Sequence, residues 1–155
     1  MRGFNHVDKA DTFTAHRALR DADPLDYSAV VLPGGVVNAD ELRIAPGAVT
    51  FVQRIFEAGK PAAVICHGPW ALVEADLVRS RTLTSWPSLR TDIRNAGGSW
   101  VDADVQVCAN GPNTLVTSRK PDDLPVFCEQ MIKAFAGQSL PALRRGVRGR
   151  DNGEI

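Results

Sequence analysis

The stretch Lys60-Pro-Ala-Ala-Val-Ile-Cys-His-Gly-Pro-Trp70 places a short apolar run directly before a cysteine, a histidine and a glycine. Ala62 to Ile65 predict a buried strand, and the residues after Gly68 favour a helix. Cys66 is therefore expected on a tight turn from strand to helix, at the carboxyl edge of a sheet. Because backbone N–H groups at the start of a helix stabilise a thiolate, the pattern indicates a reactive cysteine.

A second interpretation makes Cys66 a small buried side chain at a strand end, which is a common place for free cysteine. The sharp turn favours the catalytic interpretation, because a purely structural cysteine does not need one. Cys108 and Cys128 lack this setting and are expected to be structural, on a strand and on a C-terminal helix. Three cysteines at irregular spacing fit neither a disulfide framework nor a zinc cluster.

Strand and helix patterns alternate on both sides of this stretch. Upstream, the sequence predicts a short edge strand over Thr12 to Leu19, a buried strand over Ser28 to Leu32 and a helix over Pro46 to Ala58. Directly downstream, it predicts a helix that ends at Ala75, a strand at Thr82 to Thr84 and a helix over Pro87 to Ala96. Two further strands, Trp100 to Cys108 and Thr114 to Ser118, are predicted on either side of the turn Asn110-Gly111. A helix over Pro121 to Ala136 follows them. Such alternation is typical of an α/β sandwich around a mostly parallel sheet.

Composition narrows the classes of protein that fit. With 155 residues, 44% of them hydrophobic, the chain suits one globular domain over residues 1–136. Eighteen basic and eighteen acidic side chains leave no net charge, which argues against nucleic acid as a partner. No apolar run is long enough to cross a membrane and no signal pattern is present, so we expect a cytoplasmic protein without a membrane partner. Residues 137–155 predict a disordered basic tail.

Five short motifs occur in a characteristic order: Leu32-Pro-Gly-Gly35, Ala63-Val-Ile-Cys-His-Gly-Pro69, Thr84-Ser-Trp-Pro87, Asn95-Ala-Gly97 and Val116-Thr-Ser-Arg119. Their order and spacing resemble the PfpI family of intracellular proteases and deglycases, within the class I glutamine amidotransferase-like superfamily. The resemblance covers nearly all of residues 1–136. It implies a flavodoxin-like three-layer sandwich with a mostly parallel central sheet.

The same resemblance implies roles for individual residues. Cys66 would be the nucleophile and His67 its neighbouring base, with the N–H groups of Gly35 and His67 forming an oxyanion hole. Asp40 would be the acidic partner that reaches the histidine across a subunit interface, and Glu41 is the competing candidate. The resemblance thus implies a homo-oligomer, a dimer or a hexamer, with no metal or organic cofactor. Two alternatives stay open: a solvated His67 without a catalytic role, and Asp40 as an ordinary carboxylate at a helix N-terminus.

The chain departs from the family pattern at its beginning. Family members start with a further strand and helix ahead of the position of Met1, so the first β-α unit is missing here. In the resemblance that unit supplies the strand beside the nucleophile's strand and a glutamate that lies against the sulfur. We therefore expect an exposed sheet edge and exposed apolar helix faces, which favour self-association.

The leading prediction is a cysteine-dependent hydrolase that acts on small carbonyl adducts or peptides, as a deglycase, a glyoxalase-like enzyme or a peptidase. Trp70 and Trp86 are expected in packing or as walls of the site. The alternative is a non-catalytic redox or stress protein in which Cys66 is oxidised. A glutamine amidotransferase is the weaker third hypothesis, because no histidine follows His67 in the sequence.

Overall fold

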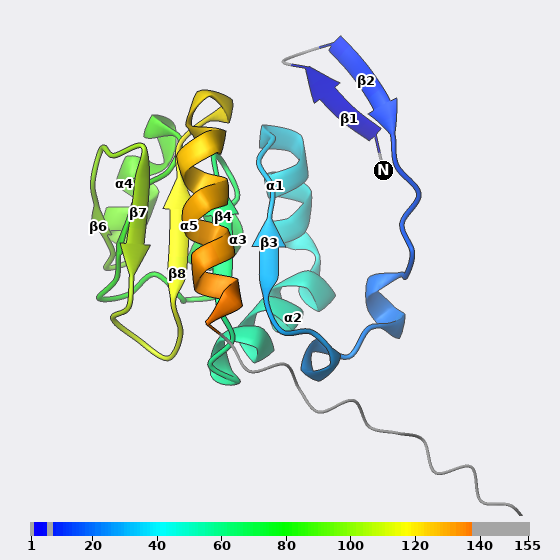
Figure 1. Ribbon diagram of the computed structural model, residues 1–155, viewed down its shortest axis with the longest axis horizontal. Helices are drawn as coiled ribbons and strands as arrows, with labels where there is room; N and C mark the ends of the chain where they lie inside the picture. Colours follow the sequence, from blue (N-terminus) through cyan, green and yellow to red (C-terminus); the bar gives the residue numbers. More distant parts are fainter. Residues whose placement is uncertain (1, 6–7, 138–155) are drawn as a thin grey trace, which may run out of the picture.

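A four-stranded sheet forms the centre of the computed structural model, which describes residues 2–5 and 8–137 (Figure 1). The strand order is β3-β4-β8-β7. β3 (Val30–Leu32), β4 (Ala62–Ile65) and β8 (Leu115–Ser118) run parallel, and β7 (Val105–Cys108) pairs with β8 in the antiparallel direction. The predicted mostly parallel sheet is confirmed.

Helices cover both faces of this sheet. α5 (Leu124–Ala136) lies in front of it in Figure 1, preceded by the 3₁₀ turn η4 (Pro121–Asp123). The opposite face carries α1 (Val36–Ile44), α2 (Pro46–Glu57), α3 (Pro69–Glu74) and α4 (Arg90–Asn95), the last preceded by η3 (Pro87–Leu89). The molecule is therefore the expected flavodoxin-like three-layer sandwich.

The β4 strand is buried on both faces. Ala62 and Val64 belong to the cluster formed with the large helical layer, whereas Ala63 and Ile65 pack with Phe127 of α5. Full burial of a side chain such as Val64 stabilises the fold by about 1.5–3 kcal/mol. This double burial explains why β4 appears in the sequence as a continuous apolar run rather than an alternating one.

The pair β5 (Thr82–Leu83) and β6 (Ser99–Trp100) forms a separate parallel sheet. The prediction of one strand from Trp100 to Cys108 is wrong, because residues 101–104 interrupt it between β6 and β7. The hairpin turn at Asn110-Gly111 does join the antiparallel strands β7 and β8, as expected.

The N-terminal region differs most from expectation. β1 (Arg2–Asn5) and β2 (Asp8–Thr12) form a two-stranded antiparallel sheet apart from the central one (Figure 1). The predicted strand from Thr12 to Leu19 is wrong. Residues 13–18 are exposed and pair with no strand that the structure describes, and two 3₁₀ turns follow, η1 (Leu19–Asp21) and η2 (Pro24–Asp26).

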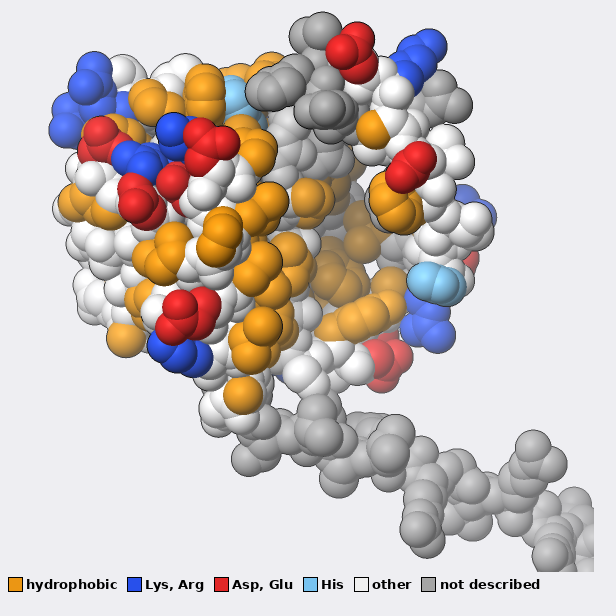
Figure 2. Space-filling view, turned by 45° about the horizontal axis from the view of Figure 1, so that its top comes forward, with side chains coloured by type: hydrophobic (Ala, Val, Ile, Leu, Met, Phe, Trp, Pro, Cys, Tyr) orange, Lys and Arg blue, Asp and Glu red, His pale blue; other side chains and the backbone are white. Residues whose placement is uncertain are grey.

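β3 is an edge strand of the central sheet. The expectation that the strand beside β4 would be lacking is wrong, because β4 lies between β3 and β8. β3 forms one edge of the sheet and β7 the other, and Val31 of β3 is 45% exposed. Figure 2 shows a hollow between the N-terminal segment and the body of the molecule, with hydrophobic side chains on its wall. An apolar cavity of about 170 Å³ is lined there by Leu19, Val30, Leu32, Leu42, Ala48, Phe51, Val52 and Ala71.

The predicted tail over 137–155 lies, apart from Gly137, outside the described residues. Among the helices that the structure does describe, none combines the length and the apolar character needed to span a membrane.

Candidate active site

Cys66 lies on a strained turn directly after β4. Its φ angle is +64°, in the left-handed region that residues other than glycine rarely adopt. Such a conformation costs about 1–3 kcal/mol and persists only where neighbours hold it. Here the Cys66 N–H donates to the Ser118 carbonyl at 3.0 Å, and the Cys66 carbonyl accepts from the Trp86 N–H at 2.9 Å. The turn from strand to helix predicted from the sequence is thus present and fixed from both sides.

Two glycines allow the loops around Cys66 to approach closely. A Cβ atom on Gly34 would lie 2.6 Å from the Cβ of Cys66 and 3.2 Å from its sulfur. A Cβ atom on Gly68 would lie 2.8 Å from a methyl group of Val64 and 3.0 Å from the Leu32 carbonyl oxygen. Since real Cβ atoms do not approach so closely, glycine is required for the loop after β3 to meet the turn after β4.

His67 is in contact with the sulfur. Its Nδ1 lies 3.2 Å from the Sγ of Cys66, and its side chain is 7% exposed. Burial lowers the pKa of His67, because an imidazolium is poorly solvated there. A neutral imidazole can accept the thiol proton, so the two side chains form a chemically competent pair. The expectation of a solvated His67 is wrong, and its catalytic role stays a prediction.

Aromatic rings and a hydroxyl group surround the His67 ring. Trp70 meets it edge-on with ring centroids 5.3 Å apart, and Trp86 stacks on it at 6.0 Å. The Trp70 Nε1–H donates to Asp92 at 2.8 Å, which fixes that indole. On its far side, the Nε2 of His67 lies 3.5 Å from the Oγ of Ser88. Sequence reasoning missed Ser88; the only indication was its place next to the Thr84 to Pro87 motif.

The predicted oxyanion donors are the backbone N–H groups of Gly35 and His67. Gly35 caps α1 with φ +96°, and its carbonyl accepts from the Ala39 N–H at 2.9 Å. Within the part of the chain that the structure describes, the N–H groups of Gly35 and His67 donate to no other group. They are therefore available to bind a negatively charged oxygen.

The predicted acidic partner does not meet the histidine within this chain. Asp40 and Glu41 are exposed on α1, and neither is hydrogen bonded to His67. The alternative that Asp40 is an ordinary carboxylate at a helix N-terminus is wrong, because the first turn of α1 holds no acidic residue. Contact with a second copy of the chain, which the resemblance implies, stays a prediction.

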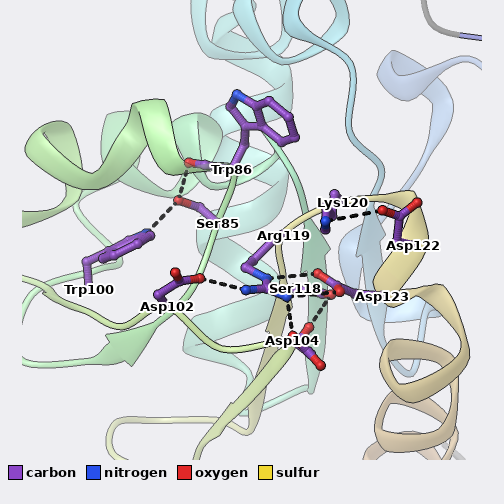
Figure 3. Close-up of polar contacts among 10 residues, drawn as sticks. All are labelled: Ser85, Trp86, Trp100, Asp102, Asp104, Ser118, Arg119, Lys120, Asp122 and Asp123. Carbon is purple, nitrogen blue, oxygen red and sulfur yellow. Dashed lines mark hydrogen bonds and ion pairs between the residues drawn. The ribbon is translucent and has the colours of Figure 1, made fainter.

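A charged cluster holds the loop that follows β8 (Figure 3). Arg119 donates to Asp102 at 2.7 Å, to Asp123 at 3.0 Å and also to Asp104. The guanidinium holds the pKa of the buried Asp123 below its usual range, and the hydrogen bonds to Asp123 and Asp102 raise the pKa of Arg119. Ser118, whose carbonyl accepts from Cys66, also donates through its hydroxyl to the Asp104 carbonyl at 2.6 Å. The cluster therefore anchors the segment to which the Cys66 backbone is bound.

A second polar chain supports the other side of the turn. The Trp100 Nε1–H donates to the Ser85 hydroxyl at 3.0 Å, which in turn donates to the Trp86 carbonyl at 2.9 Å (Figure 3).

Within residues 2–5 and 8–137, no three His, Cys, Asp or Glu side chains gather closely enough to hold a metal ion.

Known proteins are similar to this chain in sequence and in fold. The sequence model that describes the DJ-1/PfpI family matches residues 5–134 of this chain. A deglycase of Thermococcus kodakarensis is 40% identical over 123 residues, which cover 79% of this chain and 70% of the relative. Protein/nucleic acid deglycase 2 of Escherichia coli is 38% identical over 120 residues, which cover 77% of this chain and 67% of the relative. The chain spans 61–70% of the length of eight curated relatives that it matches.

Among solved structures, a two-domain protein of Anabaena variabilis with DJ-1/ThiJ/PfpI-like and ferritin-like domains matches with a TM-score of 0.70. It is 35% identical, and the match covers 83% of this chain and 36% of that one.

Proposed function

The chain belongs to the DJ-1/PfpI family, and on this basis we propose that it is a cysteine-dependent hydrolase of the deglycase or peptidase type. Cys66 is the nucleophile in this proposal and His67 is its general base. The observation that carries it is the strained Cys66 backbone together with the imidazole nitrogen 3.2 Å from the sulfur. Strain of this kind is kept where it positions a reacting group.

The proposed reaction begins with transfer of the thiol proton from Cys66 to the neutral His67 ring. The sulfur then forms a bond to the substrate carbonyl carbon, and the π electrons of that carbonyl move to its oxygen. The N–H groups of Gly35 and His67 bind the resulting oxyanion, each worth about 3 kcal/mol in the transition state. For an acyl substrate, the oxyanion then re-forms the carbonyl, the bond between its carbon and the leaving group breaks, and that group takes the proton from the imidazolium. A water molecule that gives a proton to the neutral His67 attacks the thioester carbon, the bond between carbon and sulfur breaks, and the imidazolium returns the proton to the Cys66 sulfur.

The substrate class that we propose is a small carbonyl adduct of a protein side chain, or a peptide. Trp70 and Trp86 flank the imidazole, so they would form apolar walls beside the reacting carbon. Relatives named as deglycases support the adduct over the peptide.

We further propose that the working form is a homo-oligomer in which Asp40, or Glu41, of one copy approaches His67 of another. Both carboxylates are exposed on α1 and neither has a hydrogen bond or ion pair with another described residue, so they are free to meet a partner. A carboxylate at the imidazole would stabilise its charged form during the reaction.

Turnover of methylglyoxal-modified protein by the Cys66→Ser variant tests the assignment. We expect the variant to lose activity by at least about 10³-fold, since a serine hydroxyl is a far weaker nucleophile beside the same base. Cys128→Ser is the matched control, because Cys128 is a half-buried thiol on α5 with no imidazole contact, and it should keep wild-type turnover. Turnover retained by Cys66→Ser would remove the proposal. Wild-type protein that has no turnover but gains oxygen at Cys66 in peroxide would favour the redox alternative.

A further inference from the structure

The His67 ring lies between the sulfur of Cys66 and the hydroxyl group of Ser88. Its Nδ1 lies 3.2 Å from the Cys66 Sγ, and its Nε2 lies 3.5 Å from the Ser88 Oγ. Ser88 is an exposed residue in the middle of η3. In the part of the chain that the structure describes, these two atoms are the only hydrogen-bond partners of the ring nitrogens.

The position of the ring proton decides whether His67 can act as the base. A neutral imidazole carries one N–H group, so one ring nitrogen donates and the other accepts. The base proposed for Cys66 accepts the thiol proton at Nδ1, because Nδ1 faces the sulfur. The ring proton then belongs on Nε2, where Ser88 offers a hydroxyl oxygen as acceptor. In the opposite tautomer, Nδ1 would carry the proton and would present no lone pair to the thiol.

Aromatic packing fixes the plane of the ring but not its two nitrogens. Trp86 stacks on the ring and Trp70 meets it edge-on. Half a turn of the ring within that plane would exchange each nitrogen with a carbon and leave both aromatic contacts in place. Only the hydrogen bonds distinguish the two orientations, and the bond at Nε2 goes to Ser88.

The charged side chains nearest the ring leave Nε2 to Ser88. The guanidinium carbon of Arg43 lies 5.6 Å from the centre of the Trp70 ring, and Asp92 accepts the Trp70 Nε1–H at 2.8 Å. Both therefore contact Trp70 and have no hydrogen bond to His67. Among the described residues, no carboxylate competes with the Ser88 oxygen for Nε2–H.

We propose that Ser88 is a positioning residue that holds the proton on Nε2 of His67 and so leaves Nδ1 free as the base; this rests on the function proposed above. When the S–H bond of Cys66 breaks, its proton forms a bond with Nδ1 and the electron pair stays on the sulfur. The Nε2 proton remains in place throughout. Its hydrogen bond to Ser88 becomes charge-assisted, and therefore stronger, once the ring is an imidazolium.

Ser88→Ala and Ser88→Thr test this in the full-length protein, because Ser88 is exposed and neither change opens the core. The tautomer is read from the imidazole ¹⁵N shifts, and the pKa of His67 from a titration of the same signals, assigned with His67→Gln. We expect Nε2–H in the wild type. Loss of the acceptor should lower the pKa by about 0.5 or more in Ser88→Ala, and threonine should restore it. An Nδ1–H tautomer in the wild type, or an unchanged pKa in Ser88→Ala, overturns the proposal.

Kinetics on methylglyoxal-modified protein give the second measurement. Ser88→Ala should lower kcat about tenfold with KM unchanged, and Ser88→Thr should restore it. Ser99→Ala is the matched control, because Ser99 is an exposed serine on β6 whose side chain bonds no described residue, and it should keep wild-type kcat. Wild-type kcat in Ser88→Ala contradicts the role of Ser88. A wild type without turnover would instead remove the proposed function, and the titrations would still decide whether Ser88 holds Nε2–H.

A carboxylate from a second copy of the chain could hold the same proton. The titration of Ser88→Ala is therefore repeated in the Asp40→Asn/Glu41→Gln background, which removes both candidate carboxylates. We expect the lowering of the His67 pKa to persist there, because Ser88 acts from within the same chain. A Ser88 effect that disappears in this background would assign the hydrogen bond to the second copy and overturn the proposal.

Discussion

Gly34 is the residue that lets the loop after β3 reach Cys66. A Cβ atom there would lie 2.6 Å from the Cβ of Cys66, so the Gly34→Ala variant must shift one of the two loops. We expect at least about a tenfold loss of turnover and about 1–3 kcal/mol of destabilisation, measured by kinetics and urea unfolding. Gly47→Ala is the control, because the nearest heavy atom to its Cβ would be 3.8 Å away. A Gly34→Ala protein with wild-type turnover would contradict the proposed contact between the loops.

His67 should set the acidic limit of activity. Burial lowers its pKa from 6.5, so the neutral ring persists at more acidic pH than in a free histidine. The acid limb of the kcat/KM profile should therefore fall below about pH 6.5. An inflection at or above that value would contradict a buried neutral base.

The same group links pH to stability. Between the lowered pKa of folded His67 and the ordinary value of the unfolded chain, the unfolded state binds more protons. The contribution of neutral His67 to the free energy of unfolding is therefore complete above the pKa of the unfolded chain. It decreases as the pH falls toward the lowered pKa of the folded state.

Single residues differ in how well the sequence predicts them. Cys66 and His67 are consecutive and follow a buried strand, so their placement on one turn could be expected. Ser88 is 21 positions from His67 in the chain, and only the fold brings its hydroxyl to the imidazole. The Arg81 guanidinium donates to the Cys108 carbonyl from 27 positions away in the chain, and nothing in the local sequence of either residue indicates this hydrogen bond.

At the scale of elements, the contact of Arg119 with Asp123 joins the end of β8 to the start of α5. Asp123 is 6% exposed, whereas Asp104, bound to the same guanidinium, is 68% exposed. We expect Asp123→Asn to destabilise the fold by about 1–3 kcal/mol, and Asp104→Asn by less than about 1 kcal/mol, in urea unfolding at neutral pH. Equal losses would contradict the anchoring role of the buried carboxylate.

Low pH should weaken the same contact between Arg119 and Asp123. Because Arg119 lowers the pKa of Asp123, the folded state holds the carboxylate ionised at more acidic pH than the unfolded chain. Its contribution is present above the unfolded pKa and is lost as the pH falls through the folded one. The Asp123→Asn protein should accordingly show a shallower loss of stability in acid than the wild type.

Elements with a strong apolar pattern were predictable from sequence. β4 has the expected bounds, because all four of its side chains are buried. α2 begins at the expected Pro46, and its Val52, Ile55 and Phe56 form one apolar stripe. α1 was not predicted, because Ala39 is its only buried residue and its pattern is weakly amphipathic. The break between β6 and β7 serves the ion pairs of Asp102 and Asp104 with Arg119, which local sequence does not reveal.

For the whole molecule, the free edge of β3 should determine association. An unpaired edge strand beside apolar side chains is a template for pairing with another chain. Val31→Lys on β3 should weaken self-association by about tenfold or more, measured by light scattering over a concentration series. Val107→Lys is the matched control, because Val107 lies on the opposite edge strand β7 and is exposed to the same degree, 43% against 45%. A monomeric wild type, or equal effects of the two variants, would contradict association through β3.

The central claim is that the Cys66 sulfur and the His67 imidazole act as one catalytic unit. It is tested most directly by kcat/KM for Cys66→Ser, His67→Gln and the double variant on one carbonyl-adduct substrate. Residues that act together give strongly non-additive losses, so the double variant should be about as inactive as Cys66→Ser alone. Losses that multiply in the double variant would show that the two side chains act independently and would contradict the claim.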